Sequence, residues 1–300
     1  MRGIRKTDIV VGIDGSETST AAALWAADEA ARRGVRLVLL YAYMLYVYGS
    51  KNSAVPGSVA YEEAEIDADQ LLADASDAAR RAHPKLTIES LQEQEPAATA
   101  LLEVTGEAGM TVIASQARHQ AVETLIGSVA TYVAEQSKGP VVVLRGDAAS
   151  VAATGPVVVG VDGSEASESA IDFAFEAAHT RGVPLLAVHT WDSSPVQGFR
   201  RAFHLHVDHK QADTEQLAEL AAALADRTER YSGVAVQPVV RRGRAQAALL
   251  DYAREQGASL VVIGAKGVGN VLEQALGSTS RALLAHADVP IAVVRRLETD

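Results

Sequence analysis

The chain contains no cysteine and has no excess of positive charge. Without cysteine it cannot form a disulfide, a thiolate zinc site or a cysteine nucleophile, and this absence fits a reducing compartment. Asp and Glu number 38 against 27 Lys and Arg, which gives a formal net charge of −11 at pH 7. Duplex nucleic acids and anionic membranes are bound by basic surfaces. Neither nucleic acid nor membrane is therefore predicted as a partner.

Long hydrophobic runs are also missing. The longest, Leu37–Val47, has about half of the ~20 residues that span a bilayer, so it is interpreted as a buried strand with its exit loop. The basic start of the chain is followed by only a few apolar residues before Asp14, too few for the hydrophobic region of a secretory signal. These absences predict a cytoplasmic protein.

What the sequence does contain is a repeat of about 150 residues. VVGIDGS at Val10–Ser16 returns as VVGVDGS at Val158–Ser164, and RGVRLVLLYAY at Arg33–Tyr43 returns as RGVPLLAVHTW at Arg181–Trp191. A period of this length is a domain and not a solenoid unit. The chain is therefore predicted to hold two copies of one domain. Their expected bounds are residues 1–146 and 156–300, with a linker of small and polar residues at 147–155.

Within each copy, short apolar runs alternate with alanine-rich or amphipathic segments. Ser16 and Ser164 are expected to cap the first helix of each copy, and Gly34 and Gly182 to end it. The alternation predicts an α/β fold of two tandem doubly wound domains, each a five-stranded parallel sheet flanked by helices. The strands are expected at Ile9–Ile13, Val35–Ala42, Leu86–Leu91, Met110–Ile113 and Pro140–Leu144, and then at Val157–Val161, Val183–Thr190, Val234–Val239, Leu260–Ile263 and Pro290–Val294.

A loop with spaced glycines follows the fourth expected strand of the second copy. Gly264 and Gly267 lie nine residues before Gly277-Ser278, in the pattern G-x2-G-x9-G-S. Glycine is expected where the backbone takes a positive φ or lies against a ligand. Amide groups exposed at such a turn and at a helix start form an anion site, to which Lys266 adds a positive charge. The pattern therefore predicts phosphate binding.

With both VGxDGS starts, both Gly-Ser elements and the closing DVPIAVV, the chain resembles the universal stress protein family in its tandem-domain form, which is common in actinobacteria. The resemblance covers nearly the whole length. The pattern G-x2-G-x9-G-S is similar to the ATP-binding signature of that family. The resemblance implies a five-stranded parallel sheet in each domain, ATP as the ligand together with Mg²⁺, and a role as a nucleotide-dependent regulator of the stress response through a regulatory protein partner.

The resemblance also implies which residues bind the nucleotide. In the second copy, Gly160, Val161 and Asp162 would meet the adenosine, and Thr190 would contact adenine through its backbone. Ile263, Gly264, Lys266 and Gly267 would flank the ribose and phosphates, and Gly277, Ser278, Thr279 and Ser280 would hold the phosphates. The matching positions of the first copy are Gly12, Ile13, Asp14, Ala42, Gly127 and Ser128. No catalytic residues and no protein ligands for a metal are identified.

The first copy departs from this pattern at four places. Gly264, Lys266, Gly267 and Ser280 correspond there to Ala114, Gln116, Ala117 and Ala130. If each change weakens binding by roughly 1 kcal/mol, the four together weaken it by about two to three orders of magnitude. The first copy is predicted to bind ATP much more weakly than the second, or not at all.

Other functions stay open at this point. The P-loop of common NTPases is absent, so at most slow ATP hydrolysis is expected, as in an adenine-nucleotide α-hydrolase-like protein. Cyclic AMP or another adenosine ligand is compatible with the adenosine residues. In a third alternative the protein is a scaffold that nucleotide only stabilises. For Asp14 and Asp162, capping of the turn is the alternative to ligand contact.

Four further groups of residues have more than one interpretation. His204, His206 and His209 with Asp208 suggest a metal site, but a solvated segment is favoured because the first copy has no counterpart. For Tyr41, Tyr43, Tyr46 and Tyr48, core packing or a dimer surface is favoured over stacking on a nucleobase. For Trp191, burial is favoured over a position that covers adenine. Surface salt bridges are favoured for Arg241, Arg242 and Arg244 over phosphate contact.

The two copies are expected to pair with each other. Universal stress proteins commonly dimerise through the last edge strand, so Pro140–Leu144 is predicted to pair with Pro290–Val294 in an intramolecular pseudo-dimer. A further homodimer of this assembly stays open.

Overall fold

The computed structural model describes residues 3–44, 59–115, 127–146, 154–191, 209–267 and 276–295. The chain divides into two compact units, Met1–Ala149 and Ser150–Asp300. Most of the expected linker, residues 147–153, lies outside the described residues. No helix in these described ranges is long and apolar enough to cross a membrane.

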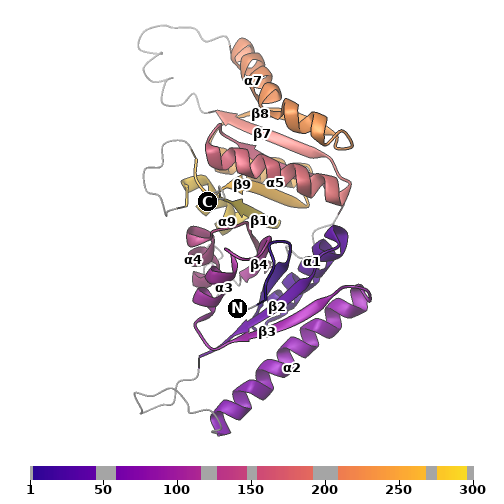
Figure 1. Cartoon of the computed structure of the whole chain (residues 1–300). Helices are drawn as coiled ribbons and strands as arrows, with labels where there is room; N and C mark the ends of the chain where they lie inside the picture. Colours follow the sequence, from indigo (N-terminus) through magenta and orange to yellow (C-terminus); the bar gives the residue numbers. More distant parts are fainter. Residues whose placement is uncertain are drawn as a thin grey trace. The chain divides into compact units, whose positions relative to one another are not determined.

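The first unit is a parallel sheet with helices on both faces. Its strands are ordered β3-β2-β1-β4-β5, and α1 packs beside α2 while α3 packs beside α4 (Figure 1). The strands are β1 (Ile9–Ile13), β2 (Leu37–Ala42), β3 (Ile88–Glu93), β4 (Met110–Ser115) and β5 (Val141–Arg145). The helices are α1 (Glu17–Arg33), α2 (Val59–Ala82), α3 (Ala97–Val104) and α4 (Ser128–Gln136).

The second unit repeats this topology. Its strands are ordered β10-β9-β6-β7-β8, and all of the pairs within this order are parallel. The strands are β6 (Val157–Val161), β7 (Leu185–Trp191), β8 (Val236–Arg242), β9 (Leu260–Gly264) and β10 (Ile291–Val294). The helices are α5 (Glu165–Arg181), α7 (His209–Arg230), α8 (Ala245–Glu255) and α9 (Ser278–His286). The predicted fold of two tandem doubly wound domains is confirmed.

The turn after the first strand is the same in both units and follows from the Asp-Gly-Ser sequence. Gly15 and Gly163 both have a φ of 78°, in the left-handed region that glycine occupies without strain. The hydroxyl oxygens of Ser16 and Ser164 accept hydrogen bonds from amides in the first helical turn, at 3.1 Å in each case. Both serines are therefore N-caps, as predicted.

The second strand begins two residues later than the sequence predicts in each unit. Gly34 closes α1 with a φ of 65°, and the Val35 amide donates to the Ala30 carbonyl at 3.0 Å. Val183 donates to Ala178 in the same way at 3.1 Å. Each valine completes the hydrogen-bonded cap of the preceding helix, so it cannot also join the sheet.

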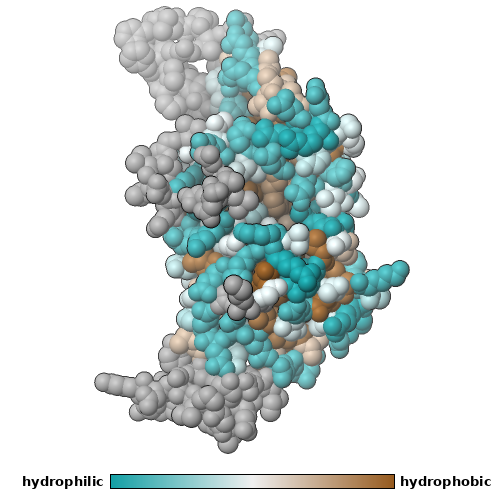
Figure 2. Space-filling view, viewed as in Figure 1, coloured by the Kyte–Doolittle hydropathy of each residue, from teal (hydrophilic) through white to brown (hydrophobic). Residues whose placement is uncertain are grey.

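Apolar side chains fill the interior, and the surface is mostly polar. The strands β1 and β6 are buried along nearly their whole length, as expected of parallel strands covered on both faces. On the face shown in Figure 2, hydrophilic residues cover most of the described surface and hydrophobic areas are small. Large apolar side chains exposed in the described residues include Leu24, Met44, Tyr132 and Leu217.

Candidate functional site

A cavity of about 580 Å³ opens in the second unit where the strands β6, β7 and β9 end at their carboxyl ends. Open parallel sheets bind ligands at this edge. All of the residues predicted for the second copy line it, namely Gly160, Val161, Asp162, Thr190, Ile263, Gly264, Lys266, Gly267, Gly277, Ser278, Thr279 and Ser280. The structure thus gathers them at one place, and their roles as ligand contacts stay predictions.

The sequence reasoning missed six lining residues. These are Ser167, Val188, Ala245, Leu249, Leu276 and Arg281. Leu249 comes from α8 and approaches β6 closely, because a Cβ on Gly160 would lie 3.1 Å from its Cδ1 atom. No motif in the sequence marks these positions.

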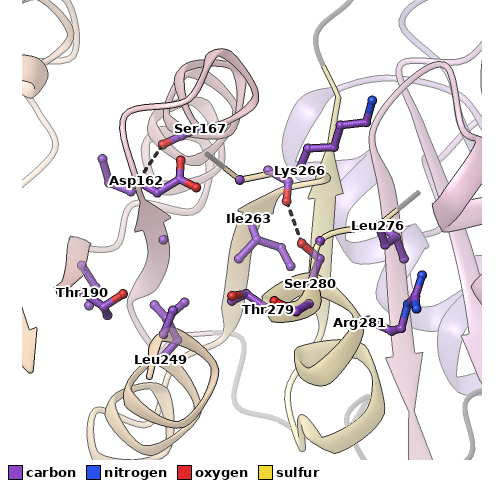
Figure 3. A pocket seen from close by; sticks show the side chains of 18 residues that line it. Asp162, Ser167, Thr190, Leu249, Ile263, Lys266, Leu276, Thr279, Ser280 and Arg281 are labelled. Atoms are coloured by element: carbon purple, nitrogen blue, oxygen red, sulfur yellow. Dashed lines mark hydrogen bonds between the residues drawn. The ribbon is translucent and has the colours of Figure 1, made fainter. Parts of the chain in front are cut away.

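The two ends of the cavity differ in chemistry. Thr190 and Leu249 lie at one end, and Lys266 and Arg281 at the other, with Ile263 between them, and Asp162 lies on the side of Thr190 and Leu249 (Figure 3). The first end is largely apolar, and the second is cationic and includes the start of α9 at Ser278. A helix start attracts anions through its unpaired amides and its dipole. The cavity therefore suits a ligand with a flat apolar part and an anionic part.

Asp162 is held by the turn that follows β6. Its Oδ1 atom accepts the Ser164 amide at 3.0 Å, and its own amide donates to the Ser167 hydroxyl at 3.2 Å. The Ser164 hydroxyl donates to the Lys266 carbonyl at 3.3 Å. This bond ties the turn after β6 to the loop after β9, and both segments line the cavity.

A positive φ does not explain the glycines of the loop, and close packing accounts for Gly264 and Gly267 but not for Gly277. Neither Gly264, Gly267 nor Gly277 has a φ in the left-handed region. A Cβ at Gly264 would lie 2.9 Å from the Ala166 carbonyl carbon, and a Cβ at Gly267 would lie 2.5 Å from Asp162 Oδ2. Of the two reasons for glycine that the sequence suggested, the positive φ is therefore wrong here.

The start of α9 is fastened to the end of β9. The Gly277 amide donates to the Ala265 carbonyl at 2.9 Å, and the Ser280 hydroxyl donates to the Gly264 carbonyl at 2.9 Å. Because its proton is used in this way and its side chain is buried, Ser280 does not donate a hydrogen bond to a ligand in this arrangement. Ser278 and Thr279 remain the hydroxyl donors of the helix start.

The corresponding region of the first unit has a different set of bonds. The hydroxyl that binds the helix start here belongs to Ser115 at the end of β4, which accepts a hydrogen bond from the Gly127 amide at 3.0 Å. Ala130 on α4, at the position of Ser280, is buried. Gly12, Ile13 and Ala42 stand at the ends of β1 and β2, and Ser128 begins α4. Ala114 lies on β4, whereas Gln116 and Ala117 lie outside the described residues.

Asp14 in the first unit caps its turn by accepting two hydrogen bonds from Ser16. Its Oδ1 atom accepts the Ser16 amide at 3.0 Å and the Ser16 hydroxyl at 2.5 Å. Partial burial opposes ionisation, but these hydrogen bonds and one with Ser19 outweigh it and lower the pKa of Asp14.

The lowered pKa of Asp14 predicts a dependence of stability on pH. A carboxyl group whose pKa is depressed by folding stabilises the protein above its unfolded pKa, about 3.9, and loses this contribution as the pH falls through its folded pKa. Asp14→Asn is therefore expected to unfold at lower urea concentration than the wild type at pH 6. The gap should narrow steadily below about pH 4. An equal gap at pH 6 and pH 3 would contradict the assignment.

The edge beyond the third strand carries opposite charge in the two units. Glu93 and Glu95 stand in the first unit where Arg241 and Gly243 stand in the second. Arg241 pairs with Glu255 and lies 4.4 Å from the centre of the Tyr252 ring, and Arg242 pairs with Asp213. The surface salt bridges favoured for these two arginines are present.

The remaining candidates do not enter the cavity lining. The Trp191 indole donates to Asp213 at 3.1 Å, and the Tyr41 and Tyr43 rings stack with centres 5.8 Å apart. Burial, then the charges of Asp67, Tyr43 and Asp14, raise the pKa of Tyr41. Other candidate residues lie outside the described residues, namely Tyr46, Tyr48, His204, His206 and Asp208, as does the side chain of His209. Within the described residues, no cluster of three metal-binding side chains occurs.

A second cavity, of about 860 Å³, lies in the first unit at the opposite, amino-terminal edge of the sheet. Its lining includes Asp8, Arg36, His83 and Glu89. Arg36 binds Asp8, at 2.5 Å, and Glu89. His83 Nε2 lies 2.5 Å from Asp28 Oδ1. Asp8, Arg36 and Glu89 therefore already pair with one another in the wall of this cavity.

Fold and site together define a tandem doubly wound α/β protein with a cavity at the carboxyl edge of its second sheet. The universal stress protein family matches residues 7–145 and 154–295. A universal stress protein of Mycobacterium tuberculosis is 33% identical over 293 residues, covering 96% of this chain and 97% of that protein. One from Mycolicibacterium smegmatis is 32% identical over 292 residues, covering 96% of each. The chain belongs to the universal stress protein family.

The fold agrees with that of a solved structure. The crystal structure of a universal stress protein from Archaeoglobus fulgidus has a TM-score of 0.72 to this chain and covers 97% of it and 99% of that protein's chain. The two sequences are 20% identical, so this likeness concerns the fold alone.

Proposed function

We propose that this universal stress protein binds ATP in the cavity of its second unit and acts as a nucleotide-dependent regulator of the stress response. The observation that supports this most is the division of the cavity into an apolar end and a cationic end (Figure 3). Its volume, about 580 Å³, falls in the range of about 300–1,000 Å³ typical of small-molecule sites.

In the proposed complex, adenine lies at the apolar end between Leu249 and Ile263, with the backbone of Thr190 at its edge. The phosphates lie at the start of α9, beside Lys266 and Arg281. Backbone amides and hydroxyls there bind phosphate oxygens, and the cations balance their charge. Among the described residues that line the cavity, Asp162 is the one carboxylate, so a magnesium ion bound with ATP would be held mainly by phosphate oxygens and water.

The first unit takes a lesser part in this proposal. Its edge carries Glu93 and Glu95, and the sequence has Gln116 in place of Lys266. A polyphosphate would meet negative charge and find no lysine, so we expect the first unit to bind ATP much more weakly. A regulatory protein partner in the cytoplasm would read the occupancy of the second unit. The pairing of Pro140–Leu144 with Pro290–Val294 stays a prediction.

Calorimetric titration of nucleotide-free protein with Mg-ATP tests the proposal. We expect one site per chain, with about 10-fold weaker binding in Lys266→Gln, because one charge-assisted contact to phosphate is lost. Lys85→Gln, which removes a positive charge from the first unit, is the matched control. Two equal sites would overturn the asymmetry, and no binding at all would overturn the proposed function.

A further inference from the structure

A cluster of three rings joins the ends of two helices in the second unit. The centre of the Tyr231 ring lies 5.6 Å from that of Phe175 and 5.5 Å from that of His179. Phe175 and His179 lie on α5, and Tyr231 directly follows α7. The rings thus occupy the space between the carboxyl ends of these two helices, at the amino-terminal edge of the sheet.

At the same place the first unit has smaller side chains and a cavity. The repeat places Ala27, Ala31 and His83 at the positions of the three rings. Ala31 and His83 line the cavity of about 860 Å³, which includes residues from the ends of α1 and α2. Smaller side chains leave a cavity where their surroundings do not collapse. The exchange of rings for alanines therefore accounts for the space in the first unit.

The wall of the cavity also differs from the matching part of the second unit. Asp8 and Arg36 pair with each other at 2.5 Å, and they stand where the second unit has Pro156 and Pro184. Arg36 pairs with Glu89 as well. The first unit thus combines an open space with fixed polar groups, at an edge where the second unit has rings and prolines.

The described lining of this cavity has one positive charge in excess. Its charged side chains are the three cations Arg5, Arg36 and Lys85 and the two carboxylates Asp8 and Glu89. His83 lies 2.5 Å from Asp28, so any positive charge on its ring is balanced there. The carbonyls at the ends of α1 and α2 repel an anion, but two arginines in the last turn of each helix offset this effect, namely Arg32, Arg33, Arg80 and Arg81.

We propose that the cavity of the first unit is a second ligand site, which takes a small aromatic carboxylic acid. The ring of the ligand lies between Ala31 and His83, where the second unit has rings of its own. Its carboxylate faces Arg5 and Lys85, neither of which has an ion pair in the described part of the chain. The volume falls in the range of about 300–1,000 Å³ typical of small-molecule sites.

The lining selects the charge and the shape of this ligand. Asp8 and Glu89 stay in the wall and repel a polyanion such as a nucleoside triphosphate, whereas the excess positive charge balances a single carboxylate. Ala30, Val35 and Leu86 also line the cavity and offer apolar surface to a ring. The site is thus separate from the nucleotide cavity of the second unit and does not depend on the proposed function.

Calorimetric titration with 2-naphthoate, a flat ring system with one carboxylate, tests the proposal. We expect one site per chain with a dissociation constant of about 0.1–1 mM. The uncharged 2-naphthalenemethanol should bind about 10-fold more weakly, because it lacks the charge-assisted contact. The double variant Arg5→Gln with Lys85→Gln should lose about fivefold in affinity for 2-naphthoate, since both cations are exposed and screened by water.

A second variant tests the space itself. Ala31→His with His83→Tyr rebuilds two rings of the second unit in the first, and it should abolish the binding of 2-naphthoate. Ala222→His is the matched control, because it adds the same side chain at an exposed position of α7. Circular dichroism shows whether each variant keeps the fold.

Three results would overturn the inference. They are equal affinity for the acid and the alcohol, undiminished binding in the folded ring variant, and no saturation by 2-naphthoate below about 10 mM in the wild type. A titration in saturating Mg-ATP separates this site from the nucleotide cavity. The affinity for 2-naphthoate should not change, and its loss would place the probe in the second unit. Failure of ATP to bind leaves the other titrations decisive.

Discussion

Placing the residues of the first copy into the second, as Gly264→Ala, Lys266→Gln and Gly267→Ala together, is expected to raise the dissociation constant for Mg-ATP by about 100-fold to 1,000-fold. At position 264 the new Cβ meets the backbone of Ala166, and at position 267 it forces the Asp162 carboxylate to move. The third removes a positive charge from the cationic end of the cavity. Each loss is of the order of 1 kcal/mol, and overpacking against the backbone costs about 1–3 kcal/mol.

Calorimetry on the folded variant measures this loss, and circular dichroism shows whether the fold is kept. Lys85→Gln combined with Gly233→Ala matches the change in charge and the change from glycine to alanine, at sites away from the cavity. This control should bind as the wild type does. An affinity within about threefold of the wild type in the triple variant would show that the alanines of the first copy do not impair a nucleotide site.

Arg36→Ala is expected to destabilise the first unit by about 3 kcal/mol. Arg36 donates to Asp8 Oδ2 at 2.5 Å and to the Gly3 carbonyl at 2.6 Å, and it also pairs with Glu89. The Asp8 side chain is 1% exposed, so removal of the arginine leaves a buried carboxylate without its cation. Breaking a buried pair costs about 3–5 kcal/mol, and the adjoining cavity lets water relieve part of that cost.

Urea unfolding followed by tryptophan fluorescence measures this change. The chain has one tryptophan in each unit, so a Trp191→Phe background leaves Trp25 to report the first unit. The double variant Asp8→Ala with Arg36→Ala is the matched control, and it should lose less stability than Arg36→Ala alone because no unpaired charge remains. The second unit cannot form this ion pair, because it carries Pro156 and Pro184 at the positions that correspond to Asp8 and Arg36. A double variant less stable than the single one would contradict this account.

Local chemistry made much of the fold predictable. The Asp-Gly-Ser turns require a glycine at positive φ and a serine cap, and both features occur at Gly15 and Gly163 as the sequence indicated. The buried parallel strands follow from runs such as Val157–Val161, because only a strand covered on both faces is apolar at nearly every position. The boundaries of β2 and β7 were missed by two residues because the helix cap takes the valine first.

Contacts between distant segments were not predictable in this way. The proton of Ser280 goes to Gly264, whereas the sequence suggested a phosphate contact. The need for glycine at positions 264 and 267 comes from Ala166 and Asp162, about 100 residues earlier in the chain. A sequence motif indicates that a position is glycine, but it does not indicate which neighbouring atom a side chain at that position would contact.

The sequence by itself determined the repeat, the doubly wound fold and the family, and it identified the residues that meet at one edge of the second sheet. It could do so because strand order and the shared edge of parallel strands follow from patterns that recur along the chain. Only the tertiary structure decided which of those side chains bond within the protein, as Ser280 does to the Gly264 carbonyl. That decision depends on distances between β6, β9 and α9, which side chains set jointly and no single segment encodes.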